Sequence, residues 1–134
     1  MADVTVTNTK FTAFNAFKLL VAHAATETTD ATAQKFVFTP TGKDNHALII
    51  ASTTADDAET EALTVTVTGG AGPFALGALT ATLPGVAGLY GFQIETGRYM
   101  QADGTIEMSF KPGASKDLKN DTALQVYVCE TLPN

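Results

Sequence analysis

A metal site in this chain would have to be built from two histidines or from one acidic stretch. His23 and His46 stand at the ends of expected strands, and no set of Cys, His or Glu residues accompanies them at metal-ligand spacing. A zinc site needs three or four such ligands to converge. Residues 53–61 carry carboxylates that suit Ca²⁺ but do not follow the order of an EF-hand loop: Asp56, Asp57, Glu59 and Glu61. We therefore expect a solvated acidic loop, no metal and no other cofactor.

The glycine-rich stretch at residues 69–74 invites comparison with phosphate-binding loops. It lacks the Lys-Ser/Thr pair of a P-loop and the spacing Gly-x-Gly-x-x-Gly, and Pro73 opposes a helix after it. A β-turn is the better interpretation. No Gly-x-Ser-x-Gly sequence, which would expose a nucleophilic serine on a sharp turn, is present in the chain.

Two carboxylates and one thiol remain as candidates for catalysis. Glu95 and Glu107 could form the carboxylate pair of a glycosidase only if they flanked a cleft. Each stands opposite the apolar residues of its expected strand, so we expect both side chains to be solvated or ion-paired. Cys129, the single cysteine, lies in an alternating apolar run, where a small packed residue is expected rather than a nucleophile. These residues do not predict an enzyme.

Arg98 is the sole arginine of the chain and stands between Gly97 and Tyr99. Its planar guanidinium suits bidentate contact with a carboxylate and stacking on aromatic rings. One interpretation is an anchor at a subunit interface, where Arg and Tyr are over-represented. The other is a surface ion pair with Glu95 or Glu107, worth about 0–1 kcal/mol.

Residues 89–110 read as one long β-hairpin that carries Arg98 near its middle. Asp103 and Gly104 predict a two-residue turn in which both residues have positive φ. Alternate apolar residues fall on one face of each arm: Tyr90, Phe92 and Ile94, then Ile106, Met108 and Phe110. This turn places Tyr99 inward, so the alternation must shift between Ile94 and Tyr99.

A β-bulge at Gly97 would produce that shift and direct Arg98 away from the sheet. The alternative is a regular strand through Gly97 with a longer turn at residues 101–104, which would keep Met100 inward.

Short alternating runs predict the other strands: residues 3–8, 17–22, 35–39, 46–52, 62–68 and 123–129. Residues 1–10 could also form an extended N-terminal arm. Residues 10–16 are either a helical turn or extended, and the strand at 17–22 is expected to point Phe17, Leu19 and Val21 inward. Eight or nine short strands without a long amphipathic helix predict a single all-β domain over residues 1–134. We expect an antiparallel β-sandwich of jelly-roll type.

Composition narrows the classes of partner. The 134 residues carry a net charge of −6 with a pI near 4.6, which argues against binding nucleic acid through its phosphates. The longest apolar run, residues 47–51, is far too short to span a bilayer, and the first residues do not form a signal peptide. Charged residues make up only 16% of the chain, so its surface suits exposed strand faces or cover by other subunits.

Four stretches of the second half resemble the small decoration, or cement, proteins of tailed-bacteriophage capsids. They are Thr-Val-Thr-Val-Thr-Gly-Gly-Ala-Gly at 64–72, Gly-Leu-Tyr-Gly-Phe-Gln-Ile-Glu-Thr-Gly-Arg-Tyr at 88–99, Asp-Gly-Thr-Ile at 103–106, and Leu-Gln-Val-Tyr-Val at 124–128. The resemblance covers about half of the chain and leaves the first sixty residues unmatched. It implies a mostly β, non-enzymatic protein that binds the outside of an expanded capsid, with no catalytic residues to carry over.

The expected function is therefore a structural virion protein on the capsid exterior, made in the host cytoplasm. Its expected partners are the major capsid protein and copies of itself, with a trimer as one arrangement, and neither nucleic acid nor membrane. The contact elements are expected at residues 2–10, 69–74 and 84–88. With Arg98 and Tyr99, they supply these interface candidates: Val4, Val6, Gly69, Gly70, Phe74, Val86, Arg98 and Tyr99.

Two alternatives stay open. One is another virion structural subunit, associated with a tail tube or a spike. The other is a small carbohydrate-binding or adhesin-like β-sandwich. The absence of Trp and the presence of only three Tyr count against the second, because such modules usually present exposed aromatic platforms.

Overall fold

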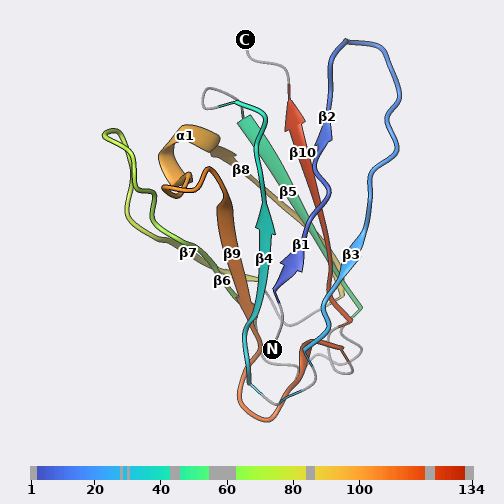
Figure 1. Cartoon of the computed structure of the whole chain (residues 1–134). Helices are drawn as coiled ribbons and strands as arrows, with labels where there is room; N and C mark the ends of the chain where they lie inside the picture. Colours follow the sequence, from blue (N-terminus) through green and yellow to red (C-terminus); the bar gives the residue numbers. More distant parts are fainter. Residues whose placement is uncertain are drawn as a thin grey trace.

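Alternating apolar residues build two facing β-sheets (Figure 1). The computed structural model describes residues 3–27, 29, 31–42, 46–54, 63–83, 87–119 and 123–131. The first sheet, sheet A, has the strand order β1 (Val4–Thr5), β4 (Gln34–Phe38), β9 (Ile106–Lys111), β6 (Leu63–Val67) and β7 (Leu79–Leu83). The second, sheet B, has the order β2 (Thr9–Lys10), β10 (Gln125–Thr131), β5 (His46–Thr53) and β8 (Gly88–Glu95), and β3 (His23–Ala24) also pairs with β10.

The inward faces of the two sheets form one core. Every second residue of the central strands is almost fully buried, as the alternation in the sequence predicts: Leu63, Val65, Val67, Ile106, Met108, Phe110, Val126 and Val128. The rings of Phe36 and Phe110 meet edge to face with centroids 5.5 Å apart. The prediction of an all-β sandwich is confirmed, whereas this strand order does not confirm a jelly roll.

The N-terminal residues form part of both sheets. β1 pairs with β4, and the Val6 amide donates to the Val37 carbonyl at 2.8 Å. The chain then crosses to sheet B, where β2 pairs with β10. Both pairings are parallel, so the expectation of purely antiparallel sheets is wrong. Of the two interpretations of this segment, a short strand or an extended arm, residues Val4–Thr5 and Thr9–Lys10 form short strands.

The predicted hairpin at residues 89–110 does not exist. β8 pairs with β5 in sheet B, whereas β9 pairs with β4 and β6 in sheet A. Between them the short helix α1 (Thr96–Tyr99) carries the chain from one sheet to the other, where a bulge at Gly97 was expected. Two buried side chains hold this turn: Thr96, whose hydroxyl donates to the Gly42 carbonyl at 2.8 Å, and Tyr99. No helix in the described part of the chain is long and apolar enough to cross a membrane.

The turn before β9 is longer than two residues. The Gly104 amide donates to the Gln101 carbonyl at 2.9 Å, and the Gln101 amide donates to the Thr105 carbonyl at 2.7 Å. Only Gly104, with φ +87°, lies in the left-handed region, as in three-residue loops where a glycine follows a type I turn. The Thr105 hydroxyl and amide donate to the Asp103 carboxylate, which lowers the pKa of that carboxyl. The longer turn and an inward, partly buried Met100 agree with the second alternative. The regular strand through Gly97 that this alternative also required is wrong, because α1 occupies that position.

Residues 11–22 form a long loop between β2 and β3, with a turn at 13–15 in which Asn15 has φ +59°. Neither a helix nor a strand forms there. Phe17, Leu19 and Val21, which were expected to point inward, are 103%, 86% and 37% exposed. The cause is the pairing at both ends of the loop. β2 and β3 each take a place beside β10, so the residues between them leave the sheet.

The carboxylate of Glu130 is fully buried and joins three segments beside this loop. It accepts hydrogen bonds from the Asn8 side-chain amide at 2.8 Å and from the Thr41 backbone amide at 2.7 Å, and also from the Thr41 hydroxyl. The Lys10 ammonium lies 3.9 Å from it, and the Glu130 carbonyl accepts from the Phe11 amide at 2.9 Å. A buried carboxylate is stable only with such a full set of donors.

Replacing Glu130 by Gln is expected to lower the free energy of unfolding by about 3 kcal/mol, because the new amide turns a donor toward the donors of Thr41. Urea denaturation would measure the loss. The matched control is Glu107→Gln, since Glu107 is partly exposed and pairs with Lys35 at 3.6 Å. Its cost is expected to stay within about 1 kcal/mol. Equal losses in the two variants would contradict the role assigned to Glu130.

Candidate functional site

The loop between β6 and β7 is fixed to α1 and to the segment that follows it. The Ala71 amide donates to the Met100 carbonyl and the Leu76 amide to the Arg98 carbonyl, each at 3.0 Å. The Gln101 side-chain amide donates to the Gly69 carbonyl at 2.7 Å. Gly70 lies so close to this segment that a Cβ there would overlap the Arg98 carbonyl oxygen. The glycines at 69 and 70 therefore serve close backbone packing between the β6–β7 loop of sheet A and the connection that leads from β8 to β9.

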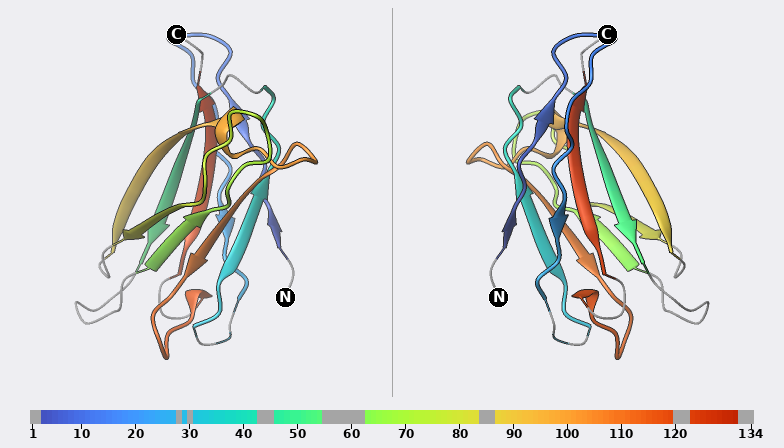
Figure 2. Two further views of the ribbon diagram at one scale, coloured as in Figure 1. Left: turned by 90° about the vertical axis from the view of Figure 1, so that its left-hand side faces the viewer. Right: turned by 90° about the vertical axis from the view of Figure 1, so that its right-hand side faces the viewer.

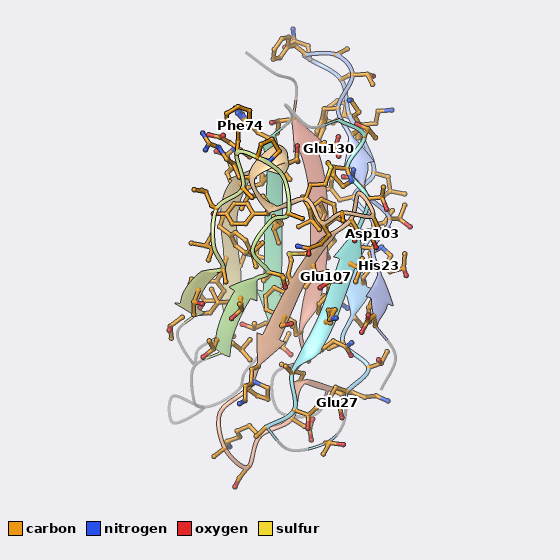
Figure 3. The ribbon with its side chains drawn as sticks, turned by 60° about the vertical axis from the view of Figure 1, so that its left-hand side comes forward. His23, Glu27, Phe74, Asp103, Glu107 and Glu130 are labelled. Atoms are coloured by element: carbon orange, nitrogen blue, oxygen red, sulfur yellow. The ribbon has the colours of Figure 1, made fainter. Side chains whose placement is uncertain are left out.

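A β-turn at residues 72–75 forms the tip of this loop, as the sequence predicts. The Ala75 amide donates to the Gly72 carbonyl at 3.1 Å, and Pro73 occupies the first central position, which its fixed φ favours. The second central residue, Phe74, projects from the tip with 77% of its surface exposed (Figure 3). The ring of Phe74 is thus exposed to solvent on a loop whose conformation is fixed by backbone hydrogen bonds.

Arg98 binds both a carboxylate and the tip of this loop. Its Nε donates to Glu95 Oε2 at 3.0 Å, and its Nη1 donates to the Phe74 carbonyl at 3.3 Å. The ion pair with Glu95 agrees with one of the two interpretations of the sequence, while Glu107 pairs with Lys35. The contact with Phe74 was not foreseen, and through it Arg98 holds the position of the exposed ring.

Two hollows flank this region at the same end of the sandwich. The larger, about 740 Å³, is lined among others by His46, Phe74, Glu95, Arg98 and Gln101. The smaller, about 540 Å³, is lined among others by Phe11, Phe14, His46, Gln93 and Thr131. His46 lines both, so the hollows adjoin. Phe14, 79% exposed, stands beside the second as Phe74 stands beside the first. We call the surface made by Phe14, Phe74 and the two hollows the apolar end.

The predicted interface residues do not form one patch. Gly69, Gly70, Phe74 and Arg98 meet at the apolar end. Val6 and Tyr99 lie in the core, 4% and 7% exposed, and offer no surface to a partner. Val4, half-buried on β1, packs against the core, and Val86 lies outside the described residues. Phe14 was missed as an interface residue, although the sequence shows the spacing of Phe11, Phe14 and Phe17. His46 was considered only as a metal ligand.

The side chains of His23, Glu95 and Glu107, which were candidates for catalysis or metal binding, lie apart, and each has its own partner. His23 accepts a hydrogen bond from the Thr7 amide on Nε2 at 2.8 Å, which makes it a structural residue. Glu95 and Glu107 belong to different sheets, and each pairs with a cation. Within the described ranges no three His, Cys, Asp or Glu side chains gather closely enough to hold a metal ion. The acidic residues Asp56, Asp57, Glu59 and Glu61 lie outside those ranges.

Cys129 is 1% exposed in β10, and burial raises the pKa of its thiol. A raised pKa leaves less of the reactive thiolate at any given pH. Ellman's reagent is therefore expected to label the folded protein far more slowly than the protein unfolded in guanidinium. Rapid labelling of the folded protein at neutral pH would contradict this assignment of a packed, unreactive thiol.

Comparison of the chain with protein-family models, with curated proteins and with solved structures finds no match. A function must therefore rest on the apolar end and on the resemblance carried by the four sequence stretches.

Proposed function

We propose that this protein is a structural virion protein that binds the outside of a tailed-phage capsid and stabilises it through contacts with neighbouring subunits. The β-sandwich fold suits the decoration proteins that the second half of the sequence resembles. The proposal includes a virion location and two kinds of partner, the major capsid protein and further copies of this chain.

The observation that carries the proposal is the exposure of Phe14 and Phe74 on two separate loops at one end of the sandwich. Burying one such side chain is worth about 1.5–3 kcal/mol. Exposed apolar patches on soluble proteins often mark interaction sites. Two rings on different loops can reach different places on a capsid, and small contacts add when one molecule bridges neighbouring subunits.

The loop that carries Phe74 is already ordered, which favours binding. Backbone hydrogen bonds to Arg98 and Met100 fix it, so little conformational freedom is lost in a complex. Charge contributes little at this place, because the carboxylate of Glu95 is paired with Arg98. A contact of this kind is expected to depend weakly on salt, since its energy comes from apolar burial rather than from exposed charges.

Replacing Phe74 by Ser is expected to weaken binding to expanded capsids by about tenfold or more, because the ring no longer buries apolar surface. Capsids lacking this protein would be prepared from the phage that encodes it, and binding would be measured by co-sedimentation at low and high salt. Arg98→Ala is expected to have a smaller effect, since it only releases the hold on the Phe74 carbonyl.

Leu89→Ser is the control for Phe74→Ser. Leu89 is 74% exposed, similar to Phe74, but lies on β8 away from the apolar end. Its replacement is expected to leave capsid binding unchanged. Wild-type binding by Phe74→Ser, or absence of the protein from purified virions by mass spectrometry, would overturn the proposal. Density on the tail in electron micrographs would instead favour a tail structural subunit.

One feature of the site favours a second candidate, a carbohydrate-binding module. The larger hollow combines the ring of Phe74 with polar side chains from His46, Glu95 and Gln101. Recognition of small polar ligands uses this combination of an apolar surface and a few directed polar groups. Saturable binding on a glycan array that disappears in Phe74→Ser would select this function over capsid binding.

A further inference from the structure

Two edge strands lie at the same margin of the sandwich (Figure 2). β7 ends sheet A and β8 ends sheet B. Leu79 and Ala81 point to the same face as the buried residues of β6, yet both are exposed, Leu79 by 38%. On β8 the inward residues Tyr90 and Phe92 are only half-buried, whereas Ile94 is buried, as is Leu83 at the end of β7. The core is therefore open along part of this margin, at Leu79, Ala81, Tyr90 and Phe92.

β7 lacks the features that normally protect an edge strand. Its sequence, Leu-Thr-Ala-Thr-Leu, contains no charge, no proline and no glycine. Edge strands of soluble proteins usually carry a lysine, a proline, a bulge or an inward-pointing charge, because their free N–H and C=O groups otherwise pair with another chain. An uncharged edge strand with an uncovered apolar face is a place where a further strand can add.

A segment suited to that place lies on the opposite margin of the same chain. Residues 16–22, Ala-Phe-Lys-Leu-Leu-Val-Ala, alternate with period two, so that Phe17, Leu19 and Val21 share one face. Within the described part of the chain this segment joins no sheet, and its backbone accepts a hydrogen bond from the Thr9 hydroxyl to the Leu19 carbonyl at 3.3 Å. Its apolar face is exposed to solvent.

We infer that residues 16–22 of one copy add as a further strand beside β7 of the next copy, so that the chain assembles head to tail. In this arrangement Phe17, Leu19 and Val21 face inward. They cover Leu79 and Ala81 of their new sheet and the half-buried side chains of β8 opposite.

The position of the two surfaces sets the symmetry of this assembly. The loop of residues 11–22 leaves sheet B beside β10, while β7 and β8 end the sheets on the other side. A donor and an acceptor on opposite margins cannot form a two-fold contact with each other. They form a heterologous contact, which gives a closed ring when the rotation between successive copies closes and an open filament when it does not. We expect the closed ring.

The apolar area is sufficient for a specific contact. Phe17 and Leu19, 103% and 86% exposed, together offer about 300 Å². A standard interface buries about 800 Å² per partner, of which a little over half, about 450 Å², is apolar. The two side chains thus supply most of the apolar part, and Val21 and the strand hydrogen bonds add to it.

Two variants separate the donor from the acceptor. Leu19→Asp places a charge on the donor face and leaves β7 able to accept, while Ala81→Lys places an inward charge on the acceptor and leaves the segment able to donate. Both residues are exposed in the single chain, so both variants are expected to fold with an unchanged melting temperature. Each change is expected to weaken self-association at least tenfold. Leu89→Asp, a change of the same kind at an exposed leucine on the outer face of β8, is the control.

Light scattering after size-exclusion chromatography would measure the mass of each sample. The wild type and the control are expected to form a closed oligomer of at least three copies, and each variant alone a monomer. An equimolar mixture of the two variants is expected to form a 1:1 complex and nothing larger, because only one donor and one acceptor remain. A monomeric wild type, or a mixture without that complex, overturns the inference. An intact ring that does not bind capsids would count against the capsid role alone.

Discussion

The buried carboxylate of Glu130 is the interaction on which the apolar end of the molecule depends. Glu130 lies on β10. Its carboxylate binds Asn8 in the N-terminal segment and Thr41 in the connection between β4 and β5. Because the loop of residues 11–22 begins directly after this attachment, its direction is set there. A carboxylate deprived of water needs every one of its donors, so these segments are fixed together rather than independently. Displacing one of the three segments therefore disturbs the other two.

The second fixed point is the crossing from sheet B to sheet A at α1. The buried side chains of Thr96 and Tyr99 hold the crossing, and the carbonyl groups of Arg98 and Met100 hold the loop that carries Phe74. Loops at the end of a sandwich are usually its most mobile parts. Here backbone hydrogen bonds join two of them, so that an exposed ring stands on a rigid support. A ring on such a support loses little conformational freedom when a partner binds it.

The sequence predicts the strands well and their partners poorly. Alternation along β6, β9 and β10 identifies the buried face because burial repeats every second residue in a strand. Alternation does not reveal which strand lies alongside, and the turn signal at Asp103 and Gly104 suggested that β8 and β9 pair with each other. The buried Thr96 decides otherwise, through a hydrogen bond to Gly42 that no local pattern announces.

The candidate site shows the same division. Pro73 and the flanking glycines predict the turn that exposes Phe74, since turn preferences are local. Arg98 donates to the Phe74 carbonyl, which lies 24 positions away in the sequence. The two hollows meet at His46 and are lined by residues of several strands and loops. Residues 17–22 carry a strand pattern that the single chain does not use, because β2 and β3 already occupy the edge beside them. Such outcomes depend on competition between distant segments rather than on the pattern of any one of them.

The pairing of β2 with β10 also bears on how the protein is made. Thr9 lies beside Cys129, so β2 can pair only after β10, which lies about 120 residues later in the sequence, has been made. During synthesis β2 and the apolar residues that follow it cannot join sheet B until β10 has left the ribosome. Contacts between such distant residues form late and slow the folding of small β-proteins.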